Sequence, residues 1–446
     1  MYESFTPPVP PVSDESLSGL ALLRALRRDV VSIWPRDAYR NSSHALTIFG
    51  RRKIFLLSDP SSVRRVLVDD VENFPRSPLR NRLIKPAIGD GLVLAEGAEW
   101  RKQRKMLSPA FIPKGVDQLA GTMAAAAEAR VATLARERQE IELPTTIARW
   151  TLEVVAKAML SLEVGDKSRR LKEMSDFYLG RLAPPRMLDI LAPPGFVTPH
   201  DLLRRYYGRR WMMFFEEVVD TLLKESERRD DLFELMRSAL DDGANSPAFR
   251  RQLRDQTATM IAGANETTSL AIFWTLYLIA QAPHIQHDIR TEIQMRRAGD
   301  TIWPTGPVLN ATFQESLRLF PPNFSIMRHV AQDTEIDGRE TPKGSTLMIL
   351  PWIIHRHEAY WRDPARFDIS RFLPGAPSPE KYHYIPYSVG PRICIGAHFA
   401  NSLAAQMISA FLSRYEISLA APPETLPSCV ALAWPDRKTY VKLTPL

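Results

Sequence analysis

One cysteine of this chain stands in a glycine-rich stretch near the C-terminus, flanked by Gly390 and Gly396 and two residues after Arg392. The glycines let the backbone turn sharply and approach a flat partner closely, and the arginine supplies a permanent cation for an anionic ligand group. An apolar helical pattern begins near Gly396, so a helix N-terminus points at Cys394 and favours the thiolate. A lone cysteine is more often a small buried hydrophobe, but this setting suits a thiolate ligand of haem iron.

An acid and a hydroxyl, Glu266 and Thr267, stand next to each other inside a long apolar pattern from about Pro247 to Ala280. At 1.5 Å per residue a helix of this length spans roughly 50 Å, enough to cross a domain. A threonine in mid-helix bonds back to the preceding turn and bends the helix. The pair is therefore either a polar patch in a buried helix or a proton-handling site beside a local opening at Ala264.

Two other helical pairs carry charge. Glu315 and Arg318 lie at i and i+3 on a helix expected from about Pro307 to Phe320, and Trp100 and Arg104 share a helix face at i and i+4. Taken alone, the first is a surface ion pair of little energetic value, and the second belongs to an ordinary basic amphipathic helix.

Together these motifs resemble the cytochrome P-450 family, the thiolate-haem monooxygenases. The cysteine stretch matches the family's Phe-x-x-Gly-x-Arg-x-Cys-x-Gly, except that Tyr387 replaces the leading Phe. The other matches are to Glu-x-x-Arg, to Trp-x-x-x-Arg and to the central-helix motif, where Ala264 replaces a usual glycine. A further departure follows the cysteine: the family often has Phe-Ala-x-x-Glu, whereas Phe399-Ala400 precedes Asn401, Ser402 and Leu403.

The resemblance implies a mainly α fold with a smaller β-rich part and haem b (iron protoporphyrin IX) between the long central helix and the cysteine-loop helix. Cys394 would be the metal ligand, on a loop shaped by Gly390 and Gly396. The implied haem-binding side chains, with propionates as their partners, are Trp100, Arg104, Arg328 and Arg392. Glu315, Arg318 and Arg371 would form a buried scaffold triad behind the cysteine loop.

The activity implied is insertion of one oxygen atom of dioxygen into a small, largely apolar substrate. Thr267 would be the hydrogen-bond partner of dioxygen, and Glu266 would relay protons. Two alternatives stay open: the same fold acting as a peroxygenase or isomerase, and a non-catalytic haem-binding protein. Retention of Glu266 and Thr267 argues against the first, and the absence of an attached signalling domain argues against a sensor.

A basic cluster at Arg101, Lys102, Arg104 and Lys105 suits an acidic electron donor, although a solvated helix face explains it equally well. We expect electrons from a separate protein, an acidic ferredoxin with its reductase. Net charge is a modest +7, and without a recognition motif it gives no reason to expect nucleic-acid binding. No N-terminal apolar run reaches the length of a membrane span, so we expect no membrane anchor and a cytoplasmic location.

The 446 residues contain 45% hydrophobic side chains, enough for a packed core. We expect a loose proline-rich N-terminus over residues 1–13 and a single domain over residues 14–446, opening with a helix from Asp14 to Arg28. A hairpin is expected over 45–58, and short strands after Pro342. Long loops at 76–97 and 176–204 would cover the substrate pocket by resemblance, and whether the basic residues of 76–85 contact substrate is left open. Cys429 reads as structural.

Overall fold

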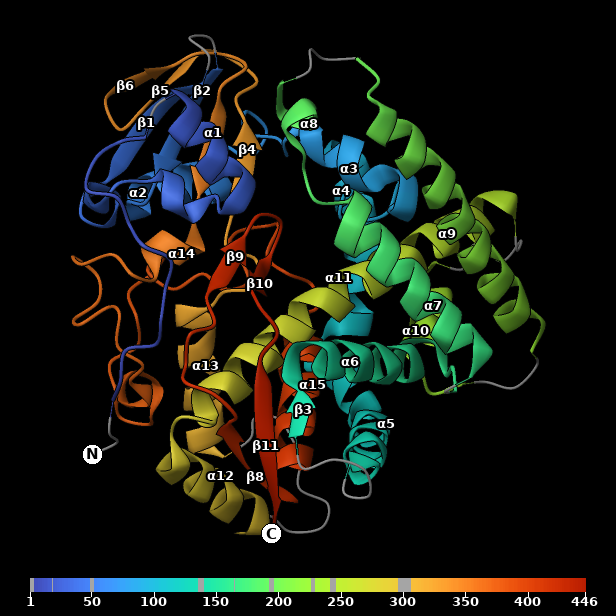
Figure 1. Cartoon of the computed structure of the whole chain (residues 1–446). Coiled ribbons are helices and arrows are strands. Elements are labelled where there is room, and N and C mark those ends of the chain that lie inside the picture. The colour runs from blue at the N-terminus through green and yellow to red at the C-terminus, as the bar shows by residue number, and fades with distance from the viewer. Residues whose placement is uncertain are drawn as a thin grey trace.

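The computed structural model describes residues 4–17, 19–48, 52–134, 140–163, 165–191, 196–225, 229–240, 246–295 and 306–446. A long helix, α11, runs through the middle of the molecule, with helices around it (Figure 1). The helices are α1 (Gly19–Arg28), α2 (Pro60–Arg64), α3 (Pro78–Ile88), α4 (Gly97–Phe111), α5 (Pro113–Ala132), α6 (Leu143–Leu160), α7 (Asp166–Phe177), α8 (Met187–Leu191), α9 (Pro199–Lys224), α10 (Leu232–Leu240), α11 (Pro247–Ile279), α12 (Pro283–Met295), α13 (Pro307–Leu319), α14 (Pro351–Ile354) and α15 (Ala397–Leu412).

The central helix α11 agrees with its sequence prediction to within one residue. Ser246 caps it by accepting a hydrogen bond from the Phe249 backbone N–H at 3.1 Å, and Pro247 occupies the first turn, where a missing N–H costs nothing. Every residue from Leu270 to Ile279 is buried, so this half of the helix passes through the core. α11 packs against α6, α9, α13 and α15, and the central helix and the cysteine-loop helix are therefore neighbours.

The strands form two small sheets and two two-stranded pairs. They are β1 (Ser43–Ile48), β2 (Arg52–Leu57), β3 (Glu140–Glu142), β4 (Ile326–His329), β5 (Thr334–Ile336), β6 (Arg339–Thr341), β7 (Thr346–Ile349), β8 (Tyr415–Leu419), β9 (Pro427–Cys429), β10 (Ala433–Pro435) and β11 (Tyr440–Pro445). The four-stranded sheet has the order β1-β2-β7-β4, with only β2 and β7 parallel, and the three-stranded sheet has the order β3-β11-β8. The predicted mainly α fold with a smaller β part is confirmed.

The expected hairpin forms between β1 and β2, with Ser43 opposite Leu57; its turn, residues 49–51, lies outside the described residues. Strands resume at Ile326, earlier than the predicted Pro342. The first described helix starts at Gly19 rather than Asp14. Two residues of the N-terminal segment are held against the body: Phe5 contacts Phe367 through a backbone hydrogen bond of 2.8 Å and a ring contact, and the Ser13 carbonyl oxygen accepts from the Arg36 N–H at 2.8 Å. The expectation of a loose segment is therefore wrong for these residues.

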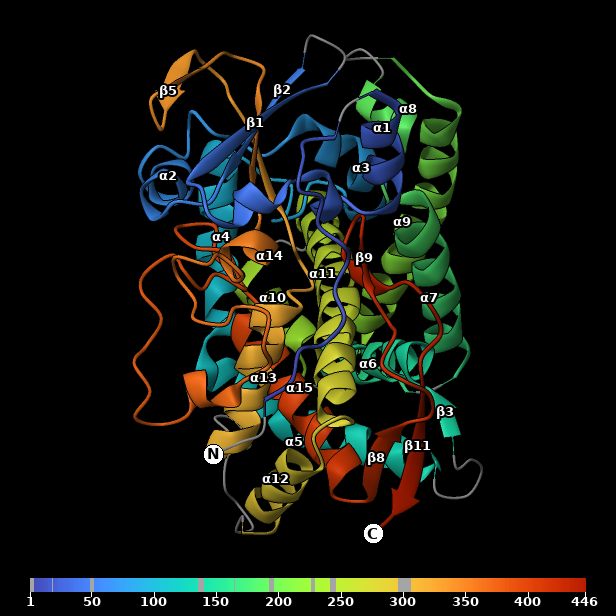
Figure 2. The ribbon, with the colours of Figure 1, turned by 60° about the vertical axis from the view of Figure 1, so that its left-hand side comes forward.

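The segment 76–97, predicted as a long loop, contains α3 (Figure 2). Pro78 begins this helix at a position that suits proline, but Pro86 lies inside it and disguises the helical pattern. α3 packs closely on α9: a Cβ added to Gly208 would lie 2.5 Å from the Pro86 carbonyl oxygen. A contact between segments more than a hundred residues apart thus stabilises a helix that local propensity disfavours.

Candidate functional site

The cysteine loop is shaped by its glycines and closed by a helix. Gly390 has φ +76°, and a Cβ there would lie 2.2 Å from the Leu67 carbonyl oxygen, so only glycine fits. The close partner of this glycine is thus a backbone group. The Cys394 backbone N–H donates to the Tyr387 carbonyl oxygen at 2.9 Å, and Gly396 is the residue from which α15 begins. The predicted helix N-terminus therefore does follow the cysteine directly.

The Cys394 side chain has accessible surface although protein surrounds it. Burial raises the pKa of its thiol, while the Gly396 N–H and Arg104 act in the opposite direction. The expected preference for the thiolate is thus outweighed by desolvation, and deprotonation would accompany binding to a metal. No atom lies within 4 Å of a Cβ built on Gly396, so the loop has an open side next to the thiol. The other cysteine, Cys429, is fully buried in β9, as expected of a structural residue.

The acid and hydroxyl of α11 stand beside a second open position. Thr267 Oγ1 donates to the Gly263 carbonyl oxygen at 2.7 Å, which is the predicted bond to the preceding turn, yet the helix continues unbroken. Space opens beside Gly263, where no atom lies within 4 Å of a built Cβ, rather than beside Ala264, which packs against the core. Burial raises the pKa of Glu266 to about 7, with a smaller contribution from Asp176 on α7. At neutral pH this carboxyl is therefore close to half protonated and can give up a proton.

Four arginines from three parts of the chain, Arg76, Arg80, Arg328 and Arg392, lie close enough to repel one another electrostatically; we call them the arginine cluster. Burial, followed by this repulsion, lowers the pKa of Arg76 to about 9 and that of Arg328 to about 10. Burial also lowers the pKa of Arg80, although its side chain retains accessible surface.

Within the described chain, one carboxylate, that of Glu96, acts on this cluster. Glu96 pairs with Arg392 and lies 3.4 Å from Arg76. Arg392 Nη1 is buried without a hydrogen-bond partner. Because guanidinium groups stay charged in proteins, four cations facing one acid leave an excess of positive charge that an anionic ligand would offset.

The structure brings some of the predicted haem-binding residues together and places others apart from them. Arg328 and Arg392 come together as expected, and the Arg392 guanidinium stacks over the Trp100 ring at 5.2 Å. Arg104 donates to the Ile393 carbonyl oxygen of the cysteine loop at 2.9 Å. Arg80, one of the basic residues whose contact with substrate is left open by the sequence, is not among the predicted haem-binding residues, because its segment is predicted to be a loop. The spacing of Arg76 and Arg80, four residues apart at the entry to α3, is the signal that the sequence offers.

The remaining basic residues of segment 76–85 are engaged within the protein. Arg82 binds Asp201, and Lys85 Nζ lies 2.7 Å from an oxygen of Asp90. Apart from Arg80, the basic residues of this segment thus form ion pairs within the protein.

The predicted scaffold triad is present. Arg318 makes two hydrogen bonds to Glu315, of 2.7 and 2.8 Å, and both side chains are fully buried. Arg371 Nε lies 3.5 Å from Glu315 Oε1. Arg318 also donates to the backbone carbonyls of His355, Pro364 and Arg366. The triad therefore ties α13 to the meander that leads into the cysteine loop.

These features fit a flat anionic cofactor with a metal centre. A free thiol beside the open side of Gly396 supplies one metal ligand, the neighbouring helix α11 has open space at Gly263, and the arginine cluster supplies cations for two carboxylates. Haem b has this combination of iron, flat ring and two propionates.

Comparisons with known proteins agree with this description. The family model for cytochrome P450 matches residues 42–443. Cyclooctatin synthase of Streptomyces melanosporofaciens is 25% identical over 380 residues, 82% of this chain and 81% of its own, and pentalenene oxygenase of Streptomyces avermitilis is 25% identical over 412 residues, 89% and 88%. The P450DA haem domain superposes with a TM-score of 0.82 at 22% identity, covering 98% of this chain and 97% of its own. The structure of retinoic acid bound cyanobacterial CYP120A1 superposes with a TM-score of 0.80 at 21% sequence identity, covering 99% of this chain and 100% of its own.

The chain belongs to the cytochrome P450 family. It is an oxidoreductase of the haem-thiolate monooxygenase class, and its cofactor is haem b.

Proposed function

We propose that this protein inserts one oxygen atom of dioxygen into a small, largely apolar organic substrate, with Cys394 as the thiolate ligand of the haem iron. The observation that carries the proposal is the Cys394 thiol, which is accessible inside the protein on the open side of a loop that ends at the α15 N-terminus. Haem, when bound, supplies the oxidising chemistry, and the protein orients and tunes it.

The chain's own groups have distinct tasks in this proposal. Arg80, Arg328 and Arg392 bind the haem propionates by charge-assisted hydrogen bonds, with Trp100 stacked against Arg392. Arg104 holds the Ile393 carbonyl and, with Gly390 and Gly396, keeps the loop in shape. Glu266 holds a proton at its carboxyl, and the Thr267 hydroxyl, which can both donate and accept, passes it towards dioxygen.

A small apolar substrate suits the apolar segments that lie near α11, where the Ala433 carbonyl oxygen accepts a hydrogen bond from the Trp274 side chain. Phe324 and Ala433 are buried, and the Ala433 N–H donates to the Pro322 carbonyl oxygen at 3.0 Å, so the apolar segments around these residues adjoin. Among the relatives, one is named for oxygenating pentalenene and one solved structure holds retinoic acid. The electron donor in this proposal is a separate acidic protein that docks against Arg101, Lys102 and Lys105, all exposed on α4.

The spectrum of the reduced, carbon monoxide-bound protein tests the ligand. We expect the red-shifted Soret band of a thiolate haem in the wild type and in Cys429→Ser, and its loss in Cys394→Ser. An unchanged band in Cys394→Ser refutes the assignment. Product formation with an electron donor, compared with peroxide alone, then tests the reaction: activity with peroxide only would favour the peroxygenase alternative, and activity with neither would favour a non-catalytic haem protein.

A further inference from the structure

A pocket lies between two neighbouring helices, α7 and α9, and none of its lining residues belongs to the haem site described above. The two helices run side by side (Figure 1). The apolar and aromatic part of the lining consists of Met174, Phe177, Tyr178, Tyr207 and Trp211. The pocket has a volume of about 240 Å³. Because a cavity of about 150 Å³ holds benzene, this space suits one ring or a fused pair of rings.

Contacts at both ends of the pocket hold the two helices at a fixed spacing. Near the start of α7, Arg170 forms an ion pair of 3.0 Å with Glu217 of α9. At the other end, Arg204 of α9 donates to the Leu182 carbonyl oxygen at 2.7 Å, in the turn Tyr178–Leu182 that directly follows α7. The space between these two contacts is therefore bounded by fixed walls.

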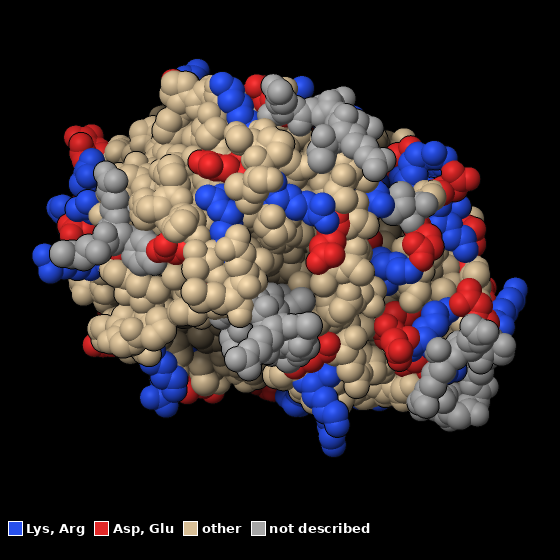
Figure 3. Space-filling model, turned by 90° about the horizontal axis from the view of Figure 1, so that it is seen from below, with Lys and Arg blue, Asp and Glu red and all other residues tan. Residues whose placement is uncertain are grey.

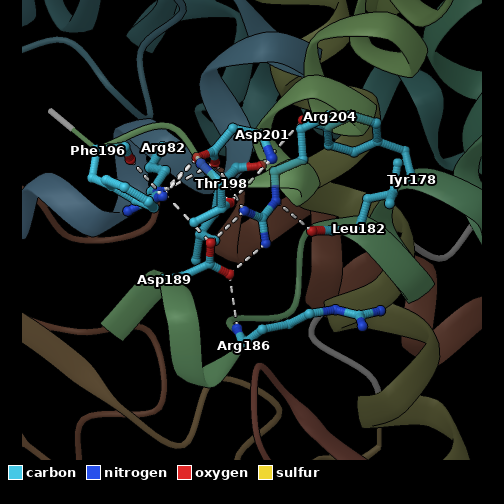
Figure 4. Close-up of polar contacts among 10 residues, drawn as sticks. Arg82, Tyr178, Leu182, Arg186, Asp189, Phe196, Thr198, Asp201 and Arg204 are labelled. Atoms are coloured by element: carbon cyan, nitrogen blue, oxygen red, sulfur yellow. Dashed lines mark hydrogen bonds and ion pairs between the residues drawn. The ribbon is translucent and has the colours of Figure 1, made fainter. Parts of the chain in front are cut away.

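The contact at Arg204 belongs to a buried charged network (Figure 4). Arg204 is fully buried and donates to both oxygens of Asp189, at 2.7 and 2.6 Å. Asp201 binds Arg204 at 3.2 Å and Arg82 of α3 at 2.6 Å. Because breaking a buried ion pair is strongly destabilising, this end of the pocket resists movement, and the pocket is formed before any ligand arrives.

The walls of the pocket suit a flat aromatic ring. Phe177 and Tyr207 form one aromatic surface, with ring centroids 4.3 Å apart and planes tilted by 45°. Trp211 is 1% exposed, and its indole N–H has no hydrogen-bond partner within the described residues. A buried donor without a partner costs free energy, so a ligand that offers an oxygen atom next to Trp211 would be favoured.

Two charged side chains complete the lining. Glu173 of α7 and Arg210 of α9 are both exposed, and neither forms an ion pair within the part of the chain that the structure describes. Ion pairs do form elsewhere on α7, where Lys172 binds Asp176. At the right of the face seen from below, basic and acidic side chains likewise lie next to one another (Figure 3). Opposite charges that line one pocket without pairing are complementary to the two ends of a dipolar ligand.

We propose that the pocket between α7 and α9 binds a small aromatic zwitterion, such as an aromatic amino acid. Its ring lies on Phe177 and Tyr207, its carboxylate on Arg210 and its ammonium group on Glu173. Arginine can bind a carboxylate through two parallel hydrogen bonds. A compound with only one of the two charges leaves one of these side chains without a counterion. This binding is independent of the oxygenation proposed above.

Calorimetric titration of the haem-loaded protein with compounds that share the indole ring tests the proposal. L-Tryptophan carries both charges, indole-3-acetate only the carboxylate, tryptamine only the ammonium group, and indole neither. We expect one molecule of L-tryptophan to bind per chain with a Kd below about 1 mM. Indole-3-acetate and tryptamine should each bind about tenfold more weakly. The Soret band should stay unchanged during the titration with L-tryptophan, because the pocket is not the haem site.

Variants of the lining separate the two charges from the ring. Arg210→Gln should weaken the binding of L-tryptophan and indole-3-acetate about tenfold and leave that of tryptamine unchanged. Glu173→Gln should weaken the binding of L-tryptophan and tryptamine and leave that of indole-3-acetate unchanged. Tyr207→Ala should weaken the binding of every compound. Arg209→Gln and Tyr206→Ala are the matched controls, because both residues are exposed on α9 and do not line the pocket.

Four results would overturn the proposal. The first is no saturable binding of L-tryptophan to the wild type. The second is equal affinity for L-tryptophan and indole, which would leave only an apolar pocket. The third is equal weakening by Arg209→Gln and Arg210→Gln, which would reduce the effect to general charge attraction. The fourth is a shift of the Soret band that persists in Tyr207→Ala, since the compound would then occupy the haem site. Haem content and circular dichroism should match the wild type in Glu173→Gln and Arg210→Gln, because both side chains are exposed.

Discussion

The Tyr387 hydroxyl donates a hydrogen bond to Asn401 Oδ1, so two departures from the family's cysteine-region pattern contact each other. Tyr387 precedes the cysteine loop and Asn401 lies on α15 behind it. The carbonyl oxygen of Tyr387 also accepts from the Cys394 N–H at 2.9 Å. One residue therefore ties the thiol-bearing loop to the helix that follows it.

The Tyr387–Asn401 pair should contribute measurably to stability. Tyr387→Phe and Asn401→Ala should each lower the free energy of unfolding by about 1 kcal/mol, and the double variant should lose clearly less than the sum. Urea unfolding of the haem-loaded protein measures this cycle. Ser402 is the matched control, since its buried hydroxyl has no hydrogen-bond partner within the described residues. The changes in unfolding free energy caused by Tyr387→Phe and Ser402→Ala should therefore be additive. Additivity in the Asn401 cycle would mean that the bond contributes nothing.

The arginine cluster should have opposite effects with and without haem. Arg80→Leu removes one of four mutually repelling cations, so the haem-free protein should gain thermal stability. The haem-loaded protein should instead lose haem about tenfold faster, because a propionate loses a charge-assisted partner. Transfer of haem to an acceptor protein measures the second effect. Arg437→Leu, a partly exposed arginine paired with Glu424, serves as control. Equal effects on both forms would exclude this role.

Glu266 should impose a pH dependence on turnover. Its pKa, raised to about 7 from an ordinary 4.5, means that the proton donor is lost as pH rises through about 7. The stability contributed by the neutral carboxyl is complete below pH 4.5 and disappears over the same rise. Turnover should therefore fall above pH 7 in the wild type. Asp176→Asn removes a charge that raises this pKa, so its profile should move to lower pH.

Two variants of the same pair separate the proton donor from the hydroxyl. Glu266→Gln should turn over slowly, with a larger solvent isotope effect and no pH fall near 7. Thr267→Ala should still consume reductant but release more peroxide for each product formed. Peroxide-supported activity should survive both changes better. An unchanged rate in Glu266→Gln with full coupling in Thr267→Ala would remove the pair from the mechanism.

The buried triad should be essential to stability rather than to chemistry. Glu315→Gln leaves Arg318 fully buried without its counterion, which should cost about 3–5 kcal/mol. Glu424→Gln breaks a partly exposed pair and should change stability by less than about 0.5 kcal/mol. Arg371 lies 3.5 Å from Glu315 and is partly exposed, so Arg371→Lys should cost less. Chemical unfolding measures the loss of stability in all three variants. A loss below about 1 kcal/mol in Glu315→Gln would contradict this assignment.

The exposed cations of α4 should affect electron delivery. Arg101 and Lys105 are exposed, and Arg101 forms a surface ion pair with Glu72. Arg101→Glu with Lys105→Glu should slow the first electron transfer about tenfold at low salt, with the difference shrinking as salt rises. Stopped-flow haem reduction by an acidic ferredoxin measures this rate. Arg205→Glu with Arg209→Glu makes the same charge change on α9, and an equal slowing there would show that only net charge matters.

Sequence alone determined those parts of the protein that local spacing encodes. The central helix from Pro247 to Ile279 was readable because its cap and apolar pattern lie within one segment. The Glu315–Arg318 pair was readable because i and i+3 positions meet on any helix. The order of motifs around Cys394 was sufficient to indicate the family and its cofactor.

Tertiary structure decided what depends on residues far apart in the chain. α3 forms across Pro86 because it packs on α9, and this packing brings Arg80 towards Arg328 and Arg392. The pKa values of Cys394 and Glu266 depend on how deeply each is buried, which spacing does not encode. The same applies to the exposed side chains of Leu188, Leu202 and Leu203: their segment, 176–204, is predicted to be a loop, and the buried network of Arg204, Asp189 and Asp201 accompanies their outward orientation. Local patterns specify which faces a helix has, but long-range contacts select which of them is buried.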